Sequence, residues 1–215
     1  CWIFAGLNML RPPLVKKLNL DPKVELSQSY LYFYHLLEQC NYFVSKVEDT
    51  KHLATGERVV DYILATPFED GGQWHMFVSL VNKYGVVPQS VFPETLHSSN
   101  TAGLKHVLNA YLRRSATLIK SDREFDRAKF LRDIYATLVK FLGSPPVDEF
   151  TWEYMDKDKK FARVTSTPLE FYNTYISPEV NVSNYVSLVN DPRNEYGTIY
   201  TTEYLGNVVG GEPIR

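Results

Sequence analysis

The chain has 215 residues, of which 44% are hydrophobic and 14% aromatic, so it can bury a substantial core and is not intrinsically disordered. Its net charge of −2 argues against a chain-wide basic surface for polyanions, and two cysteines, Cys1 and Cys40, are too few for a disulfide scaffold. No apolar run approaches the roughly 18 residues that span a bilayer, so we expect a soluble, cytoplasmic protein with no membrane partner.

The first segment is predicted to be a helix that begins at a cysteine. Residues 1–10 are nearly all apolar, which predicts a helix buried on most sides. Pro12 and Pro13 should interrupt or kink it, because proline removes an intrahelical hydrogen bond, and residues 14–20 form a short continuation. The free N–H groups of a helix start stabilise a thiolate. Cys1 is therefore a candidate nucleophile.

The next helix is marked by a favourable N-cap, Ser27. Cys40 lies within this helix and is expected to be a small buried hydrophobic residue. A shorter helix is predicted over residues 58–64. The apolar face of the long helix is formed by residues at helical spacing: Tyr30, Phe33, Tyr34, Leu37 and Val44.

A turn at Glu69-Asp70-Gly71-Gly72 precedes a further helix, which Gly85 should end in the left-handed conformation. Its apolar face is formed by Trp74, Phe77, Val78 and Val81. We assign residues 1–97 to one helical domain that contains the nucleophile helix.

A polar link near residue 98 introduces two amphipathic helices, which we interpret as a helical hairpin inserted over residues 98–146. Residues 103–140 carry nine Lys or Arg against four acidic residues, a local net charge of +5. Such a hairpin is either an ordinary solvated surface or a binding site for nucleic acid.

The remaining residues, 147–215, are predicted to mix strands with one helix. Strands are expected at 150–154, 185–189 and 198–202, with a charged turn at 156–160. Thr167 and Glu170 form a capping box with a proline between them, so a helix should begin there.

A cysteine nucleophile needs a base, and the sequence offers no recognisable one. None of the histidines lies beyond residue 106. His75 is the strongest candidate because it follows the Gly71-Gly72 turn, but helical spacing places it on the polar face as a solvated histidine. No Cys/His cluster has zinc spacing and no glycine-rich phosphate loop occurs, so we expect no metal and no cofactor.

Seven short motifs occur in the order found in one family. They include Cys1-Trp2 and Asp70-Gly71-Gly72-Gln73-Trp74, and together they cover residues 1–5, 26–31, 70–74, 83–88, 150–154, 167–171 and 189–193. This set closely resembles the bleomycin hydrolase (aminopeptidase C) family of cytosolic, papain-like cysteine peptidases. The resemblance implies an α+β fold that is predominantly helical here: the helical half of a papain-like peptidase, with insertions leading to a β-barrel half.

The resemblance also implies roles for particular residues. Cys1 is the expected nucleophile, and Gly71 and Gly72 the expected strip where the backbone of a peptide substrate pairs with the enzyme. The absence of a side chain at Gly72 should allow that close approach. The oxyanion-hole Gln, the catalytic His and the catalytic Asn of such enzymes fall outside residues 1–215. We therefore expect an internal fragment, inactive alone, of a homo-hexameric aminopeptidase whose relatives include nucleic-acid binders.

Two alternatives stay open. One is an N-terminal-nucleophile amidohydrolase in which Cys1 supplies both thiol and α-amine, although such enzymes begin with a strand. The other is a non-enzymatic module that binds nucleic acid through the basic hairpin, which predicts salt-sensitive binding that weakens when Arg113, Arg114 and Arg127 are neutralised.

Overall fold

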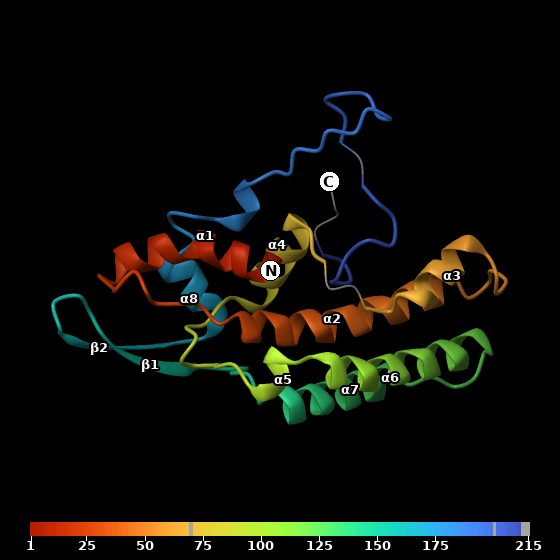
Figure 1. Cartoon of the computed structure of the whole chain (residues 1–215), viewed down its shortest axis with the longest axis horizontal. Coiled ribbons are helices and arrows are strands. Elements are labelled where there is room, and N and C mark those ends of the chain that lie inside the picture. Colours follow the sequence, from red (N-terminus) through yellow and green to blue (C-terminus); the bar gives the residue numbers. More distant parts are fainter. Residues whose placement is uncertain (69–70, 200, 212–215) are drawn as a thin grey trace.

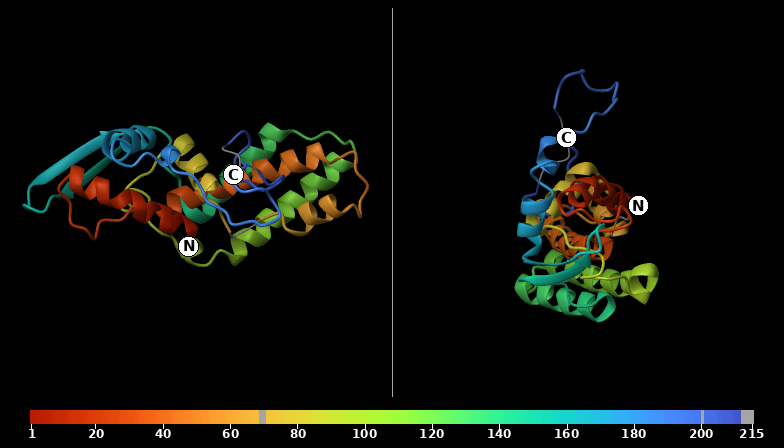
Figure 2. Two further views of the ribbon diagram at one scale, coloured as in Figure 1. Left: turned by 90° about the horizontal axis from the view of Figure 1, so that it is seen from above. Right: turned by 90° about the vertical axis from the view of Figure 1, so that its left-hand side faces the viewer.

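A long central helix organises the molecule (Figure 1). The computed structural model describes residues 1–68, 71–199 and 201–211. Two helices, α1 and α4, pack on one side of α2, and the pair α6 and α7 packs on the opposite side, as the views of Figure 2 also show. In chain order the elements are α1 (Trp2–Lys17), α2 (Gln28–Asp49), α3 (Arg58–Ala65), α4 (Trp74–Tyr84), α5 (Leu96–Ser99), α6 (Ala102–Lys120), α7 (Arg127–Leu142), β1 (Phe150–Met155), β2 (Phe161–Ser166), α8 (Pro168–Tyr175) and the 3₁₀ turn η1 (Val182–Asn184).

Helix α2 begins where the sequence predicts. The Ser27 hydroxyl accepts a hydrogen bond from the backbone N–H of Tyr30 at 3.1 Å, which is the expected N-cap. Because helices cover α2 on two sides, its burial extends well beyond one apolar face and includes His35 and Glu38. Cys40 is fully buried, as predicted.

Buried polar bonds join α2 to the end of α4. The Tyr30 hydroxyl donates to the backbone carbonyl of Tyr84 at 2.8 Å. The carboxylate of Glu38, which is 3% exposed, accepts hydrogen bonds from Lys83 Nζ at 2.6 Å and from the Tyr84 hydroxyl. Burial, and then the hydrogen bond to Glu38, raise the pKa of Tyr84 well above its ordinary value, so its hydroxyl stays a donor.

Helix α1 differs from its prediction in two ways. It continues through Pro12 and Pro13 as one helix, so the expected interruption is wrong. The carbonyls that these prolines leave without intrahelical donors belong to Asn8, which is exposed, and to the half-buried Met9, while burial of residues further along favours continuation. The face that carries Phe4 is exposed, so the helix is not buried on most sides.

The basic hairpin forms two helices as predicted, and one arginine attaches it to α2. Arg127 donates to Asn41 Oδ1 at 2.7 Å, to Ser45 Oγ at 2.6 Å and to Glu48 Oε2 at 2.9 Å, all on α2. The apolar contact with α2 is made by a stripe of buried residues on the two helices: Leu104, Leu108, Leu112, Ile119, Ile134, Leu138 and Leu142.

The last third of the chain agrees with the prediction only in part. β1 and the Thr167 capping box of α8 are confirmed, and β1 pairs antiparallel with β2, a strand that we did not predict. The strands expected at 185–189 and 198–202 are absent from the described residues of those ranges, of which Tyr200 is not one. The described residues pair neither segment with a neighbouring strand, and Leu188 is 94% exposed.

Taken over the described residues, the fold is α+β and predominantly helical, as expected. None of its helices is long and apolar enough to cross a membrane. Glu69 and Asp70 of the predicted turn lie outside the described residues.

The Arg127 contacts predict a measurable contribution to stability. We expect Arg127→Met to lower the free energy of unfolding by about 1–2 kcal/mol, because three α2 partners lose a charged donor at a partly exposed site. Lys129→Met is the matched control, because Lys129 pairs with Asp133 on the same helix surface, and a loss below about 0.5 kcal/mol is expected. Urea unfolding followed by circular dichroism measures both, and equal losses would contradict the anchoring role.

Candidate active site

Cys1 lies at the start of α1 with its side chain accessible. It is exposed and free, and it occupies the N-cap position, where its carbonyl accepts a hydrogen bond from Ala5 N–H at 3.0 Å. The first turn contains no acidic residue, and Lys16 and Lys17 lie in the last turn. A negative charge at Cys1 is therefore stabilised by the helix N-terminus with no carboxylate of the first turn to oppose it.

The Cys1 end of α1 and the segment before α4 interlock through two glycines. A Cβ atom at Gly72 would overlap the Trp2 indole, and a Cβ at Gly6 would overlap the Phe77 ring. Each element thus leaves out a side chain where the other inserts an aromatic ring. This contact holds the Gly71–Gly72 strip beside Trp2, the residue that follows Cys1.

The two glycines of the predicted strip differ in their surroundings. Gly71 is exposed and a Cβ there would meet nothing within 4 Å. Gly72 faces Trp2, so the structure gives a packing reason for this glycine that the sequence analysis missed. Its role in substrate approach stays a prediction.

A buried polar group lies behind Trp2, and no sequence signal pointed to it. The His35 ring contacts the Trp2 indole edge-to-face, with centroids 4.9 Å apart. Asn207 Nδ2 lies 3.4 Å from His35 Nδ1 and donates to the backbone carbonyl of Met76 at 3.2 Å. His35 and Asn207 are each 2% exposed. Because 172 residues separate them in the chain, only the folded structure brings them together.

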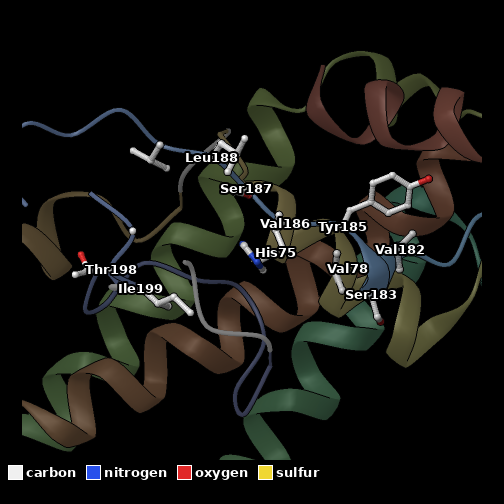
Figure 3. A pocket seen from close by; sticks show the side chains of 12 residues that line it. His75, Val78, Val182, Ser183, Tyr185, Val186, Ser187, Leu188, Thr198 and Ile199 are labelled. Carbon is white, nitrogen blue, oxygen red and sulfur yellow. The ribbon is translucent and has the colours of Figure 1, made fainter. Parts of the chain in front are cut away.

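His75 is buried, which corrects the prediction of a solvated surface histidine. It is 9% exposed because residues 182–199 fold over this side of α4, and its Nδ1 has no hydrogen-bond partner among the described residues. Together with Val78 it lines a largely apolar cavity of about 480 Å³, into which Figure 3 shows its ring directed. Among the described residues that line it there is neither Cys1 nor any residue of α1. The three other histidines, His52, His97 and His106, are exposed.

Some basic side chains of the hairpin bind other residues of the chain, and others extend into solvent without a partner among the described residues. Arg127 binds α2, Lys129 pairs with Asp133, and Lys120 Nζ donates to the Leu53 carbonyl at 3.0 Å. Within residues 103–140, all of which the structure describes, the exposed basic side chains without a hydrogen bond or ion pair are Arg113, Arg114, Arg123, Arg132 and Lys140. Arg127 is thus a structural residue and a poor choice for testing nucleic-acid binding.

A search of the described part of the chain finds no group of three or more His, Cys, Asp and Glu side chains that could hold a metal ion.

The two thiols are expected to differ sharply in reactivity. Burial raises the pKa of Cys40 far above its ordinary value, whereas Cys1 is exposed at a helix start. Iodoacetamide at near-neutral pH should therefore add once, at Cys1, and should reach Cys40 only after denaturation. Mass spectrometry of the adducts, with Cys1→Ser and Cys40→Ser as controls, measures this. A native adduct on Cys40 would overturn the assignment.

The family model described as the Peptidase C1-like family matches residues 1–215. Human bleomycin hydrolase (Homo sapiens) is 40% identical over 98% of this chain and 49% of that protein. The mitochondrial cysteine proteinase 1 of Saccharomyces cerevisiae (strain YJM789) is 41% identical over 100% of this chain and 47% of that protein.

A solved structure shows the same arrangement. The crystal structure of PepW from Lactobacillus rhamnosis HN001 superposes with a TM-score of 0.92 at 39% identity, and covers 100% of this chain and 50% of that one. The chain spans about half the length of the curated relatives it matches. The full-length family match and the relatives near 40% identity show that the chain belongs to the Peptidase C1-like family.

Proposed function

We propose that the chain is the nucleophile-bearing part of a cysteine aminopeptidase that hydrolyses peptide bonds and amide bonds of the bleomycin type. The observation that carries this proposal is the exposed Cys1 at the N-terminus of α1, locked through Trp2 to the Gly71–Gly72 strip. The family match and the relatives named bleomycin hydrolase and cysteine proteinase support it.

The proposed reaction follows from a thiolate beside a substrate strip. The Cys1 thiolate attacks the scissile carbonyl carbon, a C–S bond forms, and the C–N bond breaks as the amine leaves with a proton from a general acid. Water then hydrolyses the thioester, which releases the carboxylic acid and regenerates the thiolate. The Cys1 backbone N–H would contribute to the oxyanion site, and a His oriented by an Asn, both outside residues 1–215, would act as acid and base.

Replacing the nucleophile tests the proposal directly. In the full-length protein, Cys1→Ser should lower kcat/KM for an aminoacyl reporter by roughly 10⁴-fold or more, because the attacking thiolate is lost. Cys40→Ser is the control and should keep most of the activity, since Cys40 is buried away from the reaction.

A thiol-directed epoxide should label full-length protein once, at Cys1. Residues 1–215 alone should not hydrolyse the reporter. Full activity in Cys1→Ser would exclude the proposed mechanism.

The N-terminal-nucleophile alternative is less well supported, because Cys1 precedes a helix and not a strand. That mechanism needs a free α-amine at Cys1. Blocking the amine would abolish it and would leave a papain-like mechanism intact, so this chemical modification separates the two.

We further propose that the full-length protein is a cytoplasmic homo-hexamer with inward-facing sites. The oligomeric state is supported by the family resemblance alone. The location is supported by the two free cysteines, although the name of the yeast relative places that protein in mitochondria. Light scattering and fractionation of cells address these two points.

Nucleic-acid binding is a second proposed function, favoured by the open basic side chains of the hairpin. Changing Arg113, Arg114 and Arg132 to Gln should weaken binding to duplex DNA and lower its salt dependence, by a slope of about 0.9 for each phosphate that is no longer neutralised. The charge-matched control changes three exposed arginines elsewhere, Arg58, Arg163 and Arg193. Equal weakening in both triple variants would argue against a site on the hairpin.

A further inference from the structure

Trp2 is held between the substrate strip and a buried histidine. On one side its indole fills the place of the missing side chain of Gly72, and on another it meets the His35 ring at an interplanar angle of 75°. Trp2 is the residue directly after Cys1. A shift of the Trp2 backbone that follows a displaced indole would therefore move the adjacent thiol relative to Gly72.

Asn207 joins the two helices that enclose Trp2. Its amide nitrogen donates to the Met76 carbonyl on α4 and lies within reach of His35 Nδ1 on α2. With Asn207 as donor, His35 Nδ1 is the acceptor, which places the proton of a neutral imidazole on Nε2. The Asn207 side chain thus links α2 to α4 and also orients the His35 ring that supports Trp2.

The segment that carries Asn207 packs closely against α2 and α4. Gly206 lies against the Tyr42 ring, where a Cβ would come within 3.2 Å of a ring carbon, and Val208 is 8% exposed. Gly211 packs against Ser79 of α4. Residues 204–211 therefore pack on α2 and α4 through several contacts, of which the hydrogen bonds of the Asn207 amide are only one part.

A purely structural role explains this arrangement less well than a positioning role. A buried amide and a buried imidazole cost free energy unless their bonds are made, and an apolar pair could fill the same space without that requirement. Asn207 and His35 lie directly behind Trp2, the residue next to the nucleophile. At this place the orientation of the indole matters as well as the volume that is filled. We propose that Asn207 and His35 are positioning residues, which hold Trp2 against Gly72 and thereby set the Cys1 thiolate relative to the substrate strip.

This proposal rests on the proposed peptidase function for its kinetic consequence. Substrate contacts on the Gly71–Gly72 strip belong to the α4 side, whereas the thiol belongs to α1. Loosening the link between them misplaces the nucleophile without removing substrate contacts, so kcat should fall while KM changes little. A displacement of about 1 Å in such a geometry can cost up to roughly 10²-fold in rate.

The test compares, in the full-length protein, two polar links between α2 and α4: one made through Asn207 and one made directly by Tyr30. Asn207→Leu removes the bonds behind Trp2, and we expect kcat to fall by roughly 10- to 100-fold with KM within about twofold. Tyr30→Phe is the matched control, because it removes one side-chain bond from α2 to an α4 carbonyl at the other end of α4. It should lower the Tm without lowering kcat. Equal loss of kcat in the two variants, or a loss confined to KM, would overturn the proposal.

A readout independent of catalysis separates this proposal from the peptidase assignment. In protein labelled with 5-fluorotryptophan, the Trp2 resonance, assigned by its loss in Trp2→Phe, should shift in Asn207→Leu and stay in place in Tyr30→Phe. A protein without peptidase activity that shows this shift would refute the function and retain the positioning role. An unmoved Trp2 resonance would refute the positioning role.

If Asn207→Leu does not fold, His35→Phe replaces it, because it keeps a ring against Trp2 and removes the Nδ1 acceptor. The same separation of kcat from KM is then expected, and unchanged kcat would overturn the proposal.

Discussion

The site depends on the close approach of α1 to the start of α4, which two missing side chains allow. Gly6 admits the Phe77 ring and Gly72 admits the Trp2 indole, so each helix is fixed by an aromatic group from the other. Cores are close-packed, and an added methyl group at either glycine would have to displace a ring that is itself held by neighbours. The packing of Trp2 against Gly72 therefore helps to set the position of Cys1.

Around this contact, the buried and half-buried polar groups of α2 bond to different neighbours. Glu38 is directed to the end of α4, His35 to Trp2 and Asn207, and Asn41 with Glu48 to the basic hairpin through Arg127. Polar bonds in a poorly solvated interior are directional and costly to leave unmade. They give the packed helices a defined register, which apolar contact alone specifies less sharply.

The features that the sequence predicts well are those decided locally. The Ser27 cap and the Thr167 capping box depend on residues a few positions apart, and the structure confirms them. The misses depend on distant parts of the chain. Pro12 and Pro13 stay helical because burial of α1 outweighs the lost bonds, and His75 is buried because residues 182–199 fold over it. The Asn207–His35 pair spans most of the chain, so no local pattern could indicate it.

The same geometry limits the direction from which a base can reach Cys1. The inner side of the α1 start is filled by Trp2, Gly72 and the buried His35. The other side is open: Cys1, Phe4, Ala5 and Asn8 share one helical face and are all exposed in this structure. If Cys1 is the proposed nucleophile, its base must approach across this face, where the exposed Phe4 offers apolar contact. Under the proposed peptidase function, the described residues hold the nucleophile through Trp2 and leave this side of Cys1 uncovered for the base.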